Sequence, residues 1–329
     1  MGSDAHPGAT PAMLGLMMTT RRQVPHWGRI PHWGRIAVLA SLLVSSASSL
    51  AQDFGTGLLW RVDPPNGAAA SHLYGTVHLD DVRAVRFSPV VRQTLAQSRR
   101  FALELVTDES SAQVFQTAAT LPSSQNLATL LPAADYQRVE DLLRNRYGVP
   151  AYVTEHMAPW AAYVTLNLPG PKMGYSVDEL LHHLAVKQGK PVTALESVEA
   201  QVGAMQAIPL SQQTALLSAA ARDHARVLES VQQLLERYLA EDLKGIFELQ
   251  DDAAAAAPEI ADAQTALLES VLYGRNPGMA EQTARLANEG AAFVALGALH
   301  LYGPRGVLAE LEKRGYRISR VPLKTNPGS

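Results

Sequence analysis

Short apolar runs rich in β-branched and aromatic residues stand at both ends of the chain, and helical periodicity fills the region between them. The runs predict six strands, at residues 58–63, 72–77, 100–106, 191–195, 291–296 and 316–321. Apolar residues at helical spacing predict helices at 88–98, 111–119, 133–146, 159–167, 177–188, 197–206, 210–240, 261–288 with breaks, and 307–314. The low-complexity tract 251–258 is interpreted as a helix end or an exposed linker.

This order of elements indicates an α/β (α+β) fold. The turn-rich segment PPNGAAAS joins the first two predicted strands, which is typical of a hairpin. If the N-terminal and C-terminal strands join one mixed sheet, the ends of the domain are tied together around a large helical middle region.

The first 51 residues have the three parts of a secretory signal peptide. Four arginines precede the apolar stretch 36–44, and a run of small residues follows it and ends at Ala51. The apolar stretch is too short for a permanent transmembrane helix. We therefore expect export to the periplasm or the medium, cleavage after Ala51, and a single mature domain at 52–329. A retained membrane anchor is the alternative.

Charge and composition narrow the function classes. The chain has 329 residues, 31 acidic and 28 basic, for a net charge of -3. The leader holds four basic residues and one acidic residue, so its removal leaves 24 basic and 30 acidic residues, a net charge of -6. Without a dense basic run, the sequence argues against a nucleic-acid binder. It contains no Cys, which excludes thiol catalysis and limits metal ligands to His and carboxylate.

A five-residue pattern, G-x-x-H-L, occurs twice, each time directly after a β-prone run. One copy runs from Gly75 to Leu79 and the other from Gly297 to Leu301. A glycine at a strand end permits a sharp turn, so each histidine can project from the rim of the sheet. Together, His78 and His300 would offer two imidazoles to a metal ion. The alternative is that each is a structural histidine.

Glu104 is the third candidate. It interrupts the apolar run FALELV, where a buried carboxylate costs several kcal/mol unless it is paired or binds a cation. Two histidines and one carboxylate form a common divalent-metal set. In the alternative, Glu104 lies on the solvated face of an edge strand. No Walker loop, H-E-x-x-H or G-x-S-x-G motif offers a competing chemistry.

These residues resemble the TraB/PrgY/GumN group, which is related to the Tiki metalloproteases. The resemblance rests on LYGTVHL, FALELV, ALESVEAQ, GRNPGMA and FVALGALHLYGPRGVLAELEKRGYRI, and extends from about Leu59 to Val321. It implies a domain of the erythromycin-esterase, ChaN and Tiki type, and a metal-dependent hydrolase. It also implies that His78, His300 and Glu104 form the metal centre.

Further positions follow from the same resemblance. Arg275 and Asn276 match the family's Arg-Asn pair, and Glu196 matches the Glu of its Leu-Glu segment. Arg275 could clamp an oxyanion or a carboxylate, or could instead be a surface residue that caps the preceding helix. The sequence departs from the family at Ser176, where a Gly is usual two residues before Asp178. Asp178 and His182 share a helix face, and a solvated face is the interpretation we favour for them.

The first hypothesis is therefore an exported, peptidase-like metal-dependent hydrolase that acts on a peptide or a small-molecule substrate. Water activated by Mn, Co or Zn at the His78 and His300 site would attack an amide or ester, with Glu104 as a ligand or a general base. The second hypothesis is a non-catalytic envelope protein that binds or sequesters a peptide or a polysaccharide intermediate. An ester hydrolase of the erythromycin-esterase type ranks third.

Overall fold

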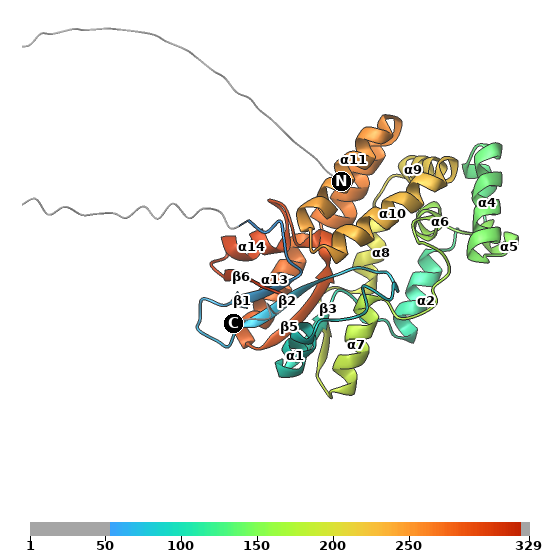
Figure 1. Cartoon of the computed structure of the whole chain (residues 1–329). Helices are drawn as coiled ribbons and strands as arrows, with labels where there is room; N and C mark the ends of the chain where they lie inside the picture. The colour runs from blue at the N-terminus through green and yellow to red at the C-terminus, as the bar shows by residue number, and fades with distance from the viewer. Residues whose placement is uncertain (1–52, 324–329) are drawn as a thin grey trace, which may run out of the picture. The chain divides into compact units, whose positions relative to one another are not determined.

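The computed structural model describes residues 53–323, and its centre is one six-stranded sheet (Figure 1). The predicted leader and its cleavage site lie outside the described residues. The strand order is β4-β3-β5-β2-β1-β6. The strands are β1 Leu59–Asp63, β2 Ser71–Thr76, β3 Arg100–Leu103, β4 Val192–Ala194, β5 Ala292–Gly297 and β6 Arg317–Val321.

Four neighbouring strands of this sheet are parallel. β5 pairs in parallel with β2 on one side and with β3 on the other, and β3 pairs in parallel with β4. β1 is antiparallel to both β2 and β6. All six residues of β5 are buried, as expected for a central parallel strand that is covered on both faces and reads as a continuous apolar run.

The helices are α1 Pro89–Gln97, α2 Glu109–Ala118, α3 Leu127–Leu130, α4 Ala133–Tyr147, α5 Ala151–Thr154, α6 Pro159–Leu166, α7 Val177–Lys187, α8 Val198–Gln206, α9 Leu210–Arg222, α10 His224–Leu239, α11 Leu243–Ala256, α12 Ala261–Leu268, α13 Asn276–Glu289 and α14 Val307–Lys313. Single turns of 3-10 helix occur at Pro258–Ile260 and Ala298–His300, and a π-helix spans Glu269–Tyr273.

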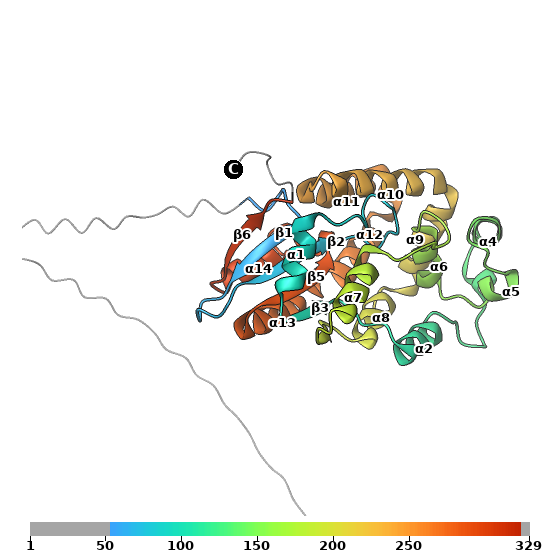
Figure 2. The same cartoon turned by 60° about the horizontal axis from the view of Figure 1, so that its bottom comes forward.

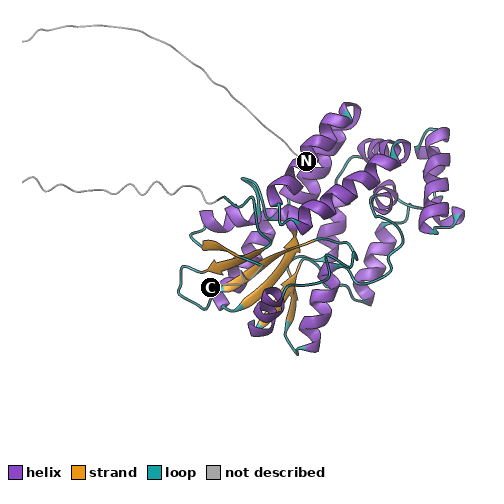
Figure 3. Ribbon diagram, in the orientation of Figure 1, coloured by secondary structure: helices purple, strands orange, loops and turns teal. Residues whose placement is uncertain are grey.

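The buried apolar residues form two clusters. The larger one surrounds the sheet and includes residues of α1, α7, α13 and α14. The smaller one joins α3, α4, α6 and α9, away from the sheet. Figures 1 and 2 both show this helical layer beside the sheet, and Figure 3 shows the strands grouped at one side of it. Two separate clusters thus form the apolar core of residues 53–323.

The predicted fold class is confirmed: N-terminal and C-terminal strands join one mixed sheet around a helical middle. The predicted hairpin is the β1 and β2 pair. The tract at 251–258 is chiefly a helix end, because α11 extends to Ala256. No helix within 53–323 combines the length and the apolar character that crossing a membrane requires.

Three local predictions were wrong. The single helix at 210–240 is two helices, because Asp223 leaves the helical conformation and its side chain caps the N-terminus of α10. The helix from Leu243 was not predicted, although Leu243, Ile246 and Phe247 stand at helical spacing. The third strand ends at Leu103 and not at Val106, which places Glu104 just beyond it.

Candidate active site

The carboxyl ends of the four parallel strands place the predicted site residues along one edge. Thr76 at the end of β2 pairs with Gly297 at the end of β5. Leu103 at the end of β3 pairs with Ala295 and with Ala194. The segments that carry His78, His300, Glu104 and Glu196 therefore leave the sheet side by side. Ligand sites of open α/β sheets form at such edges.

Gly297 marks the point where the three predicted metal ligands converge. A Cβ atom on this residue would lie 3.0 Å from Glu104 Oε1, 3.5 Å from His300 Cδ2 and 3.8 Å from His78 Nε2. The second G-x-x-H motif therefore needs its glycine for space, since a side chain would crowd the carboxylate. The two histidines, 222 residues apart in sequence, face one small volume beside Glu104.

Asn276 fixes the ring of His300. The Nδ1 atom of His300 lies 2.6 Å from Asn276 Oδ1, and Asn276 Nδ2 donates to the Arg305 carbonyl at 2.8 Å. Because the second bond sets the orientation of the amide, Asn276 accepts from Nδ1–H. Burial lowers the pKa of His300 to about 4. The ring is thus neutral at pH 7, and its Nε2 carries the free lone pair, 3.9 Å from Glu104 Oε1.

Asp178 and Thr76 fix the ring of His78 in a similar way. His78 Nδ1 lies 2.8 Å from Asp178 Oδ2, and Thr76 Oγ1 donates to the other carboxylate oxygen. The Asp178 charge raises the pKa of His78 above its ordinary value, although the side chain is 66% exposed and water screens part of this attraction. Both histidines therefore engage Nδ1 with a partner, which leaves Nε2 of His300 near Glu104 and Nε2 of His78 near Gly297.

Glu104 belongs to a buried ionic group. Its Oε1 accepts from the Gly297 N–H at 2.6 Å, and its Oε2 accepts from Arg275 Nη2 at 3.1 Å. The same guanidinium donates to both oxygens of Glu196, with Nε at 3.0 Å. Burial opposes ionisation, but the positive neighbours, of which Arg275 is charged at every pH, outweigh it and lower the pKa of Glu104. One guanidinium and two carboxylates leave an excess negative charge.

These contacts exclude a solvated position for Glu104 and a surface position for Arg275. β3 lies between β4 and β5, and Glu104 is 6% exposed, so it does not lie on the solvated face of an edge strand. The side chain of Arg275 is 13% exposed and bridges two carboxylates, so it is not a surface residue. A fourth bond of the guanidinium goes to the Val271 carbonyl at 2.8 Å, so Arg275 does cap the preceding π-helix.

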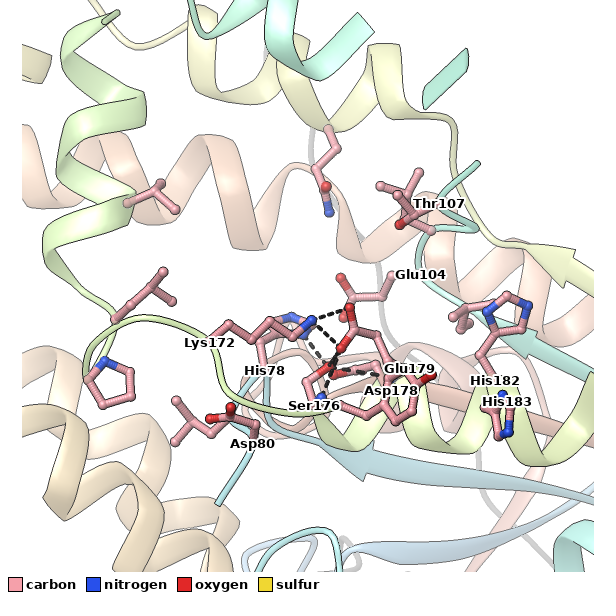
Figure 4. A pocket seen from close by; sticks show the side chains of 18 of the residues that line it. His78, Asp80, Glu104, Thr107, Lys172, Ser176, Asp178, Glu179, His182 and His183 are labelled. Atoms are coloured by element: carbon pink, nitrogen blue, oxygen red, sulfur yellow. Dashed lines mark hydrogen bonds and ion pairs between the residues drawn. The ribbon is translucent and has the colours of Figure 1, made fainter. Parts of the chain in front are cut away.

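A pocket of about 720 Å³ opens beside this group. His78, Glu104 and Asp178 contribute to its lining, together with the segment between α6 and α7 and the exposed face of α7 (Figure 4). His182 and His183 line it farther along α7. Its walls mix apolar and charged side chains, which is the character of a ligand site.

A sequence model of the TraB/PrgY/gumN family matches residues 58–320. The chain belongs to this family. The protein Metalloprotease TIKI2 of the zebrafish Danio rerio is 25% identical to the chain, over 80% of the chain and 61% of TIKI2. The chain therefore spans about three fifths of the length of that relative. No solved structure matches the chain.

The family resemblance inferred from the motifs is thus confirmed, and the family match covers both G-x-x-H segments. In this TraB/PrgY/gumN protein, as the side chains of residues 53–323 stand, no three or more His, Asp or Glu residues are grouped closely enough to bind a metal ion. The donor chemistry nevertheless fits a divalent cation. Two imidazoles with fixed Nδ1 partners lie beside a carboxylate that belongs to a group with excess negative charge.

Asp178 is the residue that sequence reasoning undervalued. Its side chain is 13% exposed and bonds to His78, so the solvated helix face that we favoured for it was wrong. Ser176 caps α7 and forms a capping box with Glu179, which places Asp178 in the first helical turn. The Ser-x-Asp pattern before a helix was a visible signal. The packing of that helix end against β2 was not.

Proposed function

We propose that this TraB/PrgY/gumN protein is a metal-dependent hydrolase that cleaves peptide bonds, with His78, His300 and Glu104 as its metal ligands. The observation that carries the proposal is the convergence of both histidines and Glu104 Oε1 around Gly297. The name of the zebrafish relative, a metalloprotease, supports the reaction class. Mn, Co and Zn all suit the mixed nitrogen and oxygen donors.

Each residue of the site then has a defined task. Asn276 and Asp178 orient the two imidazoles. The Nε2 lone pair of His300 is available, and Nε2 of His78, whose pKa Asp178 raises, would release its proton when an ion binds. Arg275 keeps Glu104 ionised and holds one carboxylate oxygen, so that Oε1 remains on the histidine side. A divalent ion, when bound, would lower the pKa of water and polarise a carbonyl. The pocket offers the room in which a peptide can lie beside these residues.

Metal content and turnover test the assignment together. The wild type, His78→Ala, His300→Ala and Glu104→Gln are purified, loaded with Mn, Co or Zn in turn, and desalted. We expect metal bound by the wild type, with at least a tenfold loss of affinity in each variant, because each removes one ligand. Hydrolysis of a mixed peptide library should decline in the same variants.

His156→Ala is the matched control, since His156 is an exposed histidine of the helical layer. It should bind metal and hydrolyse peptides as the wild type does. Equal metal content in the wild type and the three site variants would contradict the proposed centre.

We also propose that the protein acts after export, in the periplasm or outside the cell. The arginines, the apolar stretch and the small residues that end at Ala51 support this proposal. An exported protein without cysteine needs no disulfide, which is consistent with a fold held by two apolar clusters.

A second candidate is a binding protein of the envelope that sequesters a peptide or a polysaccharide intermediate without turnover. It is favoured by the finding that no metal-binding group is formed by the described side chains as they stand. For this candidate, a ligand should bind equally well to the wild type before and after chelation, and no hydrolysis should be detected. Binding lost on chelation would favour the hydrolase.

A further inference from the structure

The segment between α6 and α7 forms a wall of the pocket without regular secondary structure of its own. We call residues 168–175, with the sequence LPGPKMGY, the strap. Leu168, Lys172 and Tyr175 are among its residues that line the pocket. A segment with two prolines, two glycines and mostly exposed side chains gains little from packing. Its position therefore depends on hydrogen bonds, ion pairs and ring contacts with neighbouring side chains, which we call ties.

Asp80 supplies the most specific of these ties. Its Oδ2 accepts from two consecutive backbone amides of the strap, Met173 N–H at 2.7 Å and Gly174 N–H at 2.8 Å. Asp80 follows His78 by two residues, on the segment that leaves β2. Bonds from amides to a carboxylate are stronger than those to a neutral acceptor. One carboxylate thus joins the strap to the segment that carries a predicted metal ligand.

The other ties reach the strap from the helices on both sides. Lys172 Nζ forms an ion pair with Glu179, the neighbour of Asp178 on α7 (Figure 4). The ring of Tyr175 stacks on His183 with centroids 5.6 Å apart. At the α4 side, Tyr147 Oη donates to the Leu168 carbonyl at 2.8 Å, and Arg146 Nη2 donates to the Pro169 carbonyl at 2.6 Å. Asp80 is the tie that comes from the sheet edge, where the candidate site lies.

We propose that Asp80 is a positioning residue that fixes the strap as a substrate-binding wall beside His78. This inference rests on the proposed hydrolase function, and it makes a separate claim about which substrates need the strap. A peptide that extends from the reacting centre along the pocket contacts the strap. A substrate that occupies the centre alone does not.

The functional test compares two substrates of different length. From the library we take one nonapeptide that the wild type cleaves, and a blocked dipeptide that contains the same scissile bond. In Asp80→Ala we expect KM for the nonapeptide to rise about tenfold, since two charge-assisted hydrogen bonds hold the wall. The values of kcat for both substrates, and KM for the dipeptide, should stay within about twofold.

Two further variants separate this role from a general loss of structure. Asp80→Asn keeps an acceptor oxygen, so its KM for the nonapeptide should lie close to the wild-type value. Asp81→Ala is the matched control, because the neighbouring carboxylate bonds to Arg83, with Arg83 Nε at 3.0 Å, and not to the strap. Equal effects of Asp80→Ala on both substrates, or an equal effect of Asp81→Ala, would overturn the proposal.

Hydrogen exchange tests the tie without turnover. In a proteolytic fragment that contains residues 168–175, we expect exchange about tenfold faster in Asp80→Ala than in the wild type and Asp81→Ala, because two amides lose their acceptor. If the wild type hydrolyses no peptide, the hydrolase proposal fails, and hydrogen exchange still tests whether Asp80 holds the strap in place. Identical exchange in all three proteins would overturn it.

Discussion

At the residue scale, the amide of Asn276 decides which nitrogen of His300 is available. Its own amide nitrogen donates to the Arg305 carbonyl, so the oxygen that faces His300 accepts. With a pKa near 4, His300 is neutral over the physiological range and needs no deprotonation before it binds a cation. Asn276 is 1% exposed and acts through His300, which makes it a positioning residue.

We expect Asn276→Ala to weaken metal binding and hydrolysis about 10-fold to 100-fold, because the His300 ring loses its orienting partner. Asn276→Asp keeps an acceptor for Nδ1–H but loses the donor to the Arg305 carbonyl, so it should retain only part of the affinity. Metal affinity is measured by isothermal titration calorimetry, and circular dichroism checks that each variant is folded. Wild-type affinity in a folded Asn276→Ala protein would remove this residue from the site.

The sequence predicts a site residue only where a local motif marks it. His78, His300 and Glu104 each follow a β-prone run, and the end of a strand is visible in the pattern of apolar residues. Asp178 lies 100 residues from His78, and their 2.8 Å contact depends on how α7 packs against the sheet. A helical period shows which residues share a face. It does not show which strand end that face meets.

At the element scale, an ion pair between a buried carboxylate and an exposed arginine joins α4 to α9 in the helical layer. Asp135 is 3% exposed, and its Oδ1 accepts from Arg222 Nε at 2.9 Å and from Arg138 Nη1 at 3.2 Å. The hydrogen bonds from Arg222 are the main cause that lowers the pKa of Asp135 in the folded protein. The pair therefore stabilises the fold above the unfolded pKa of about 4.

We expect Asp135→Asn to lower the free energy of unfolding by about 1–3 kcal/mol at pH 7, as for a buried acceptor that loses its charged bond. As the pH falls through the lowered pKa, the wild-type carboxylate takes up a proton and the difference should vanish. Urea unfolding at a series of pH values measures it. Asp141→Asn, at an exposed pair on the same helix, is the control. A difference independent of pH would contradict an ionic cause.

Element types were easier to predict than their order in the sheet. The continuous apolar run of β5 predicts a buried strand, but its neighbours are β2 and β3, about 190 to 220 residues earlier in the chain. The repeated G-x-x-H pattern is a local sign that β2 and β5 end together. Nothing comparable marks the pairing of β3 with β4, so the edge-strand alternative for Glu104 stayed open until the sheet was known.

At the scale of the whole molecule, the family match begins at residue 58, shortly after the predicted cleavage site. We expect the full chain, expressed in a Gram-negative host, to lose residues 1–51 and to begin at Gln52. Removal of four basic residues and one acidic residue would change the net charge from -3 to -6. Intact mass and N-terminal sequencing of the osmotic-shock fraction measure both changes.

Ala51→Arg should block cleavage, because the peptidase requires a small residue there, and Gln52→Asn should leave cleavage unaffected. Full-length protein retained in the membrane fraction would instead support the anchor, and would place the candidate site beside the bilayer rather than free in the periplasm.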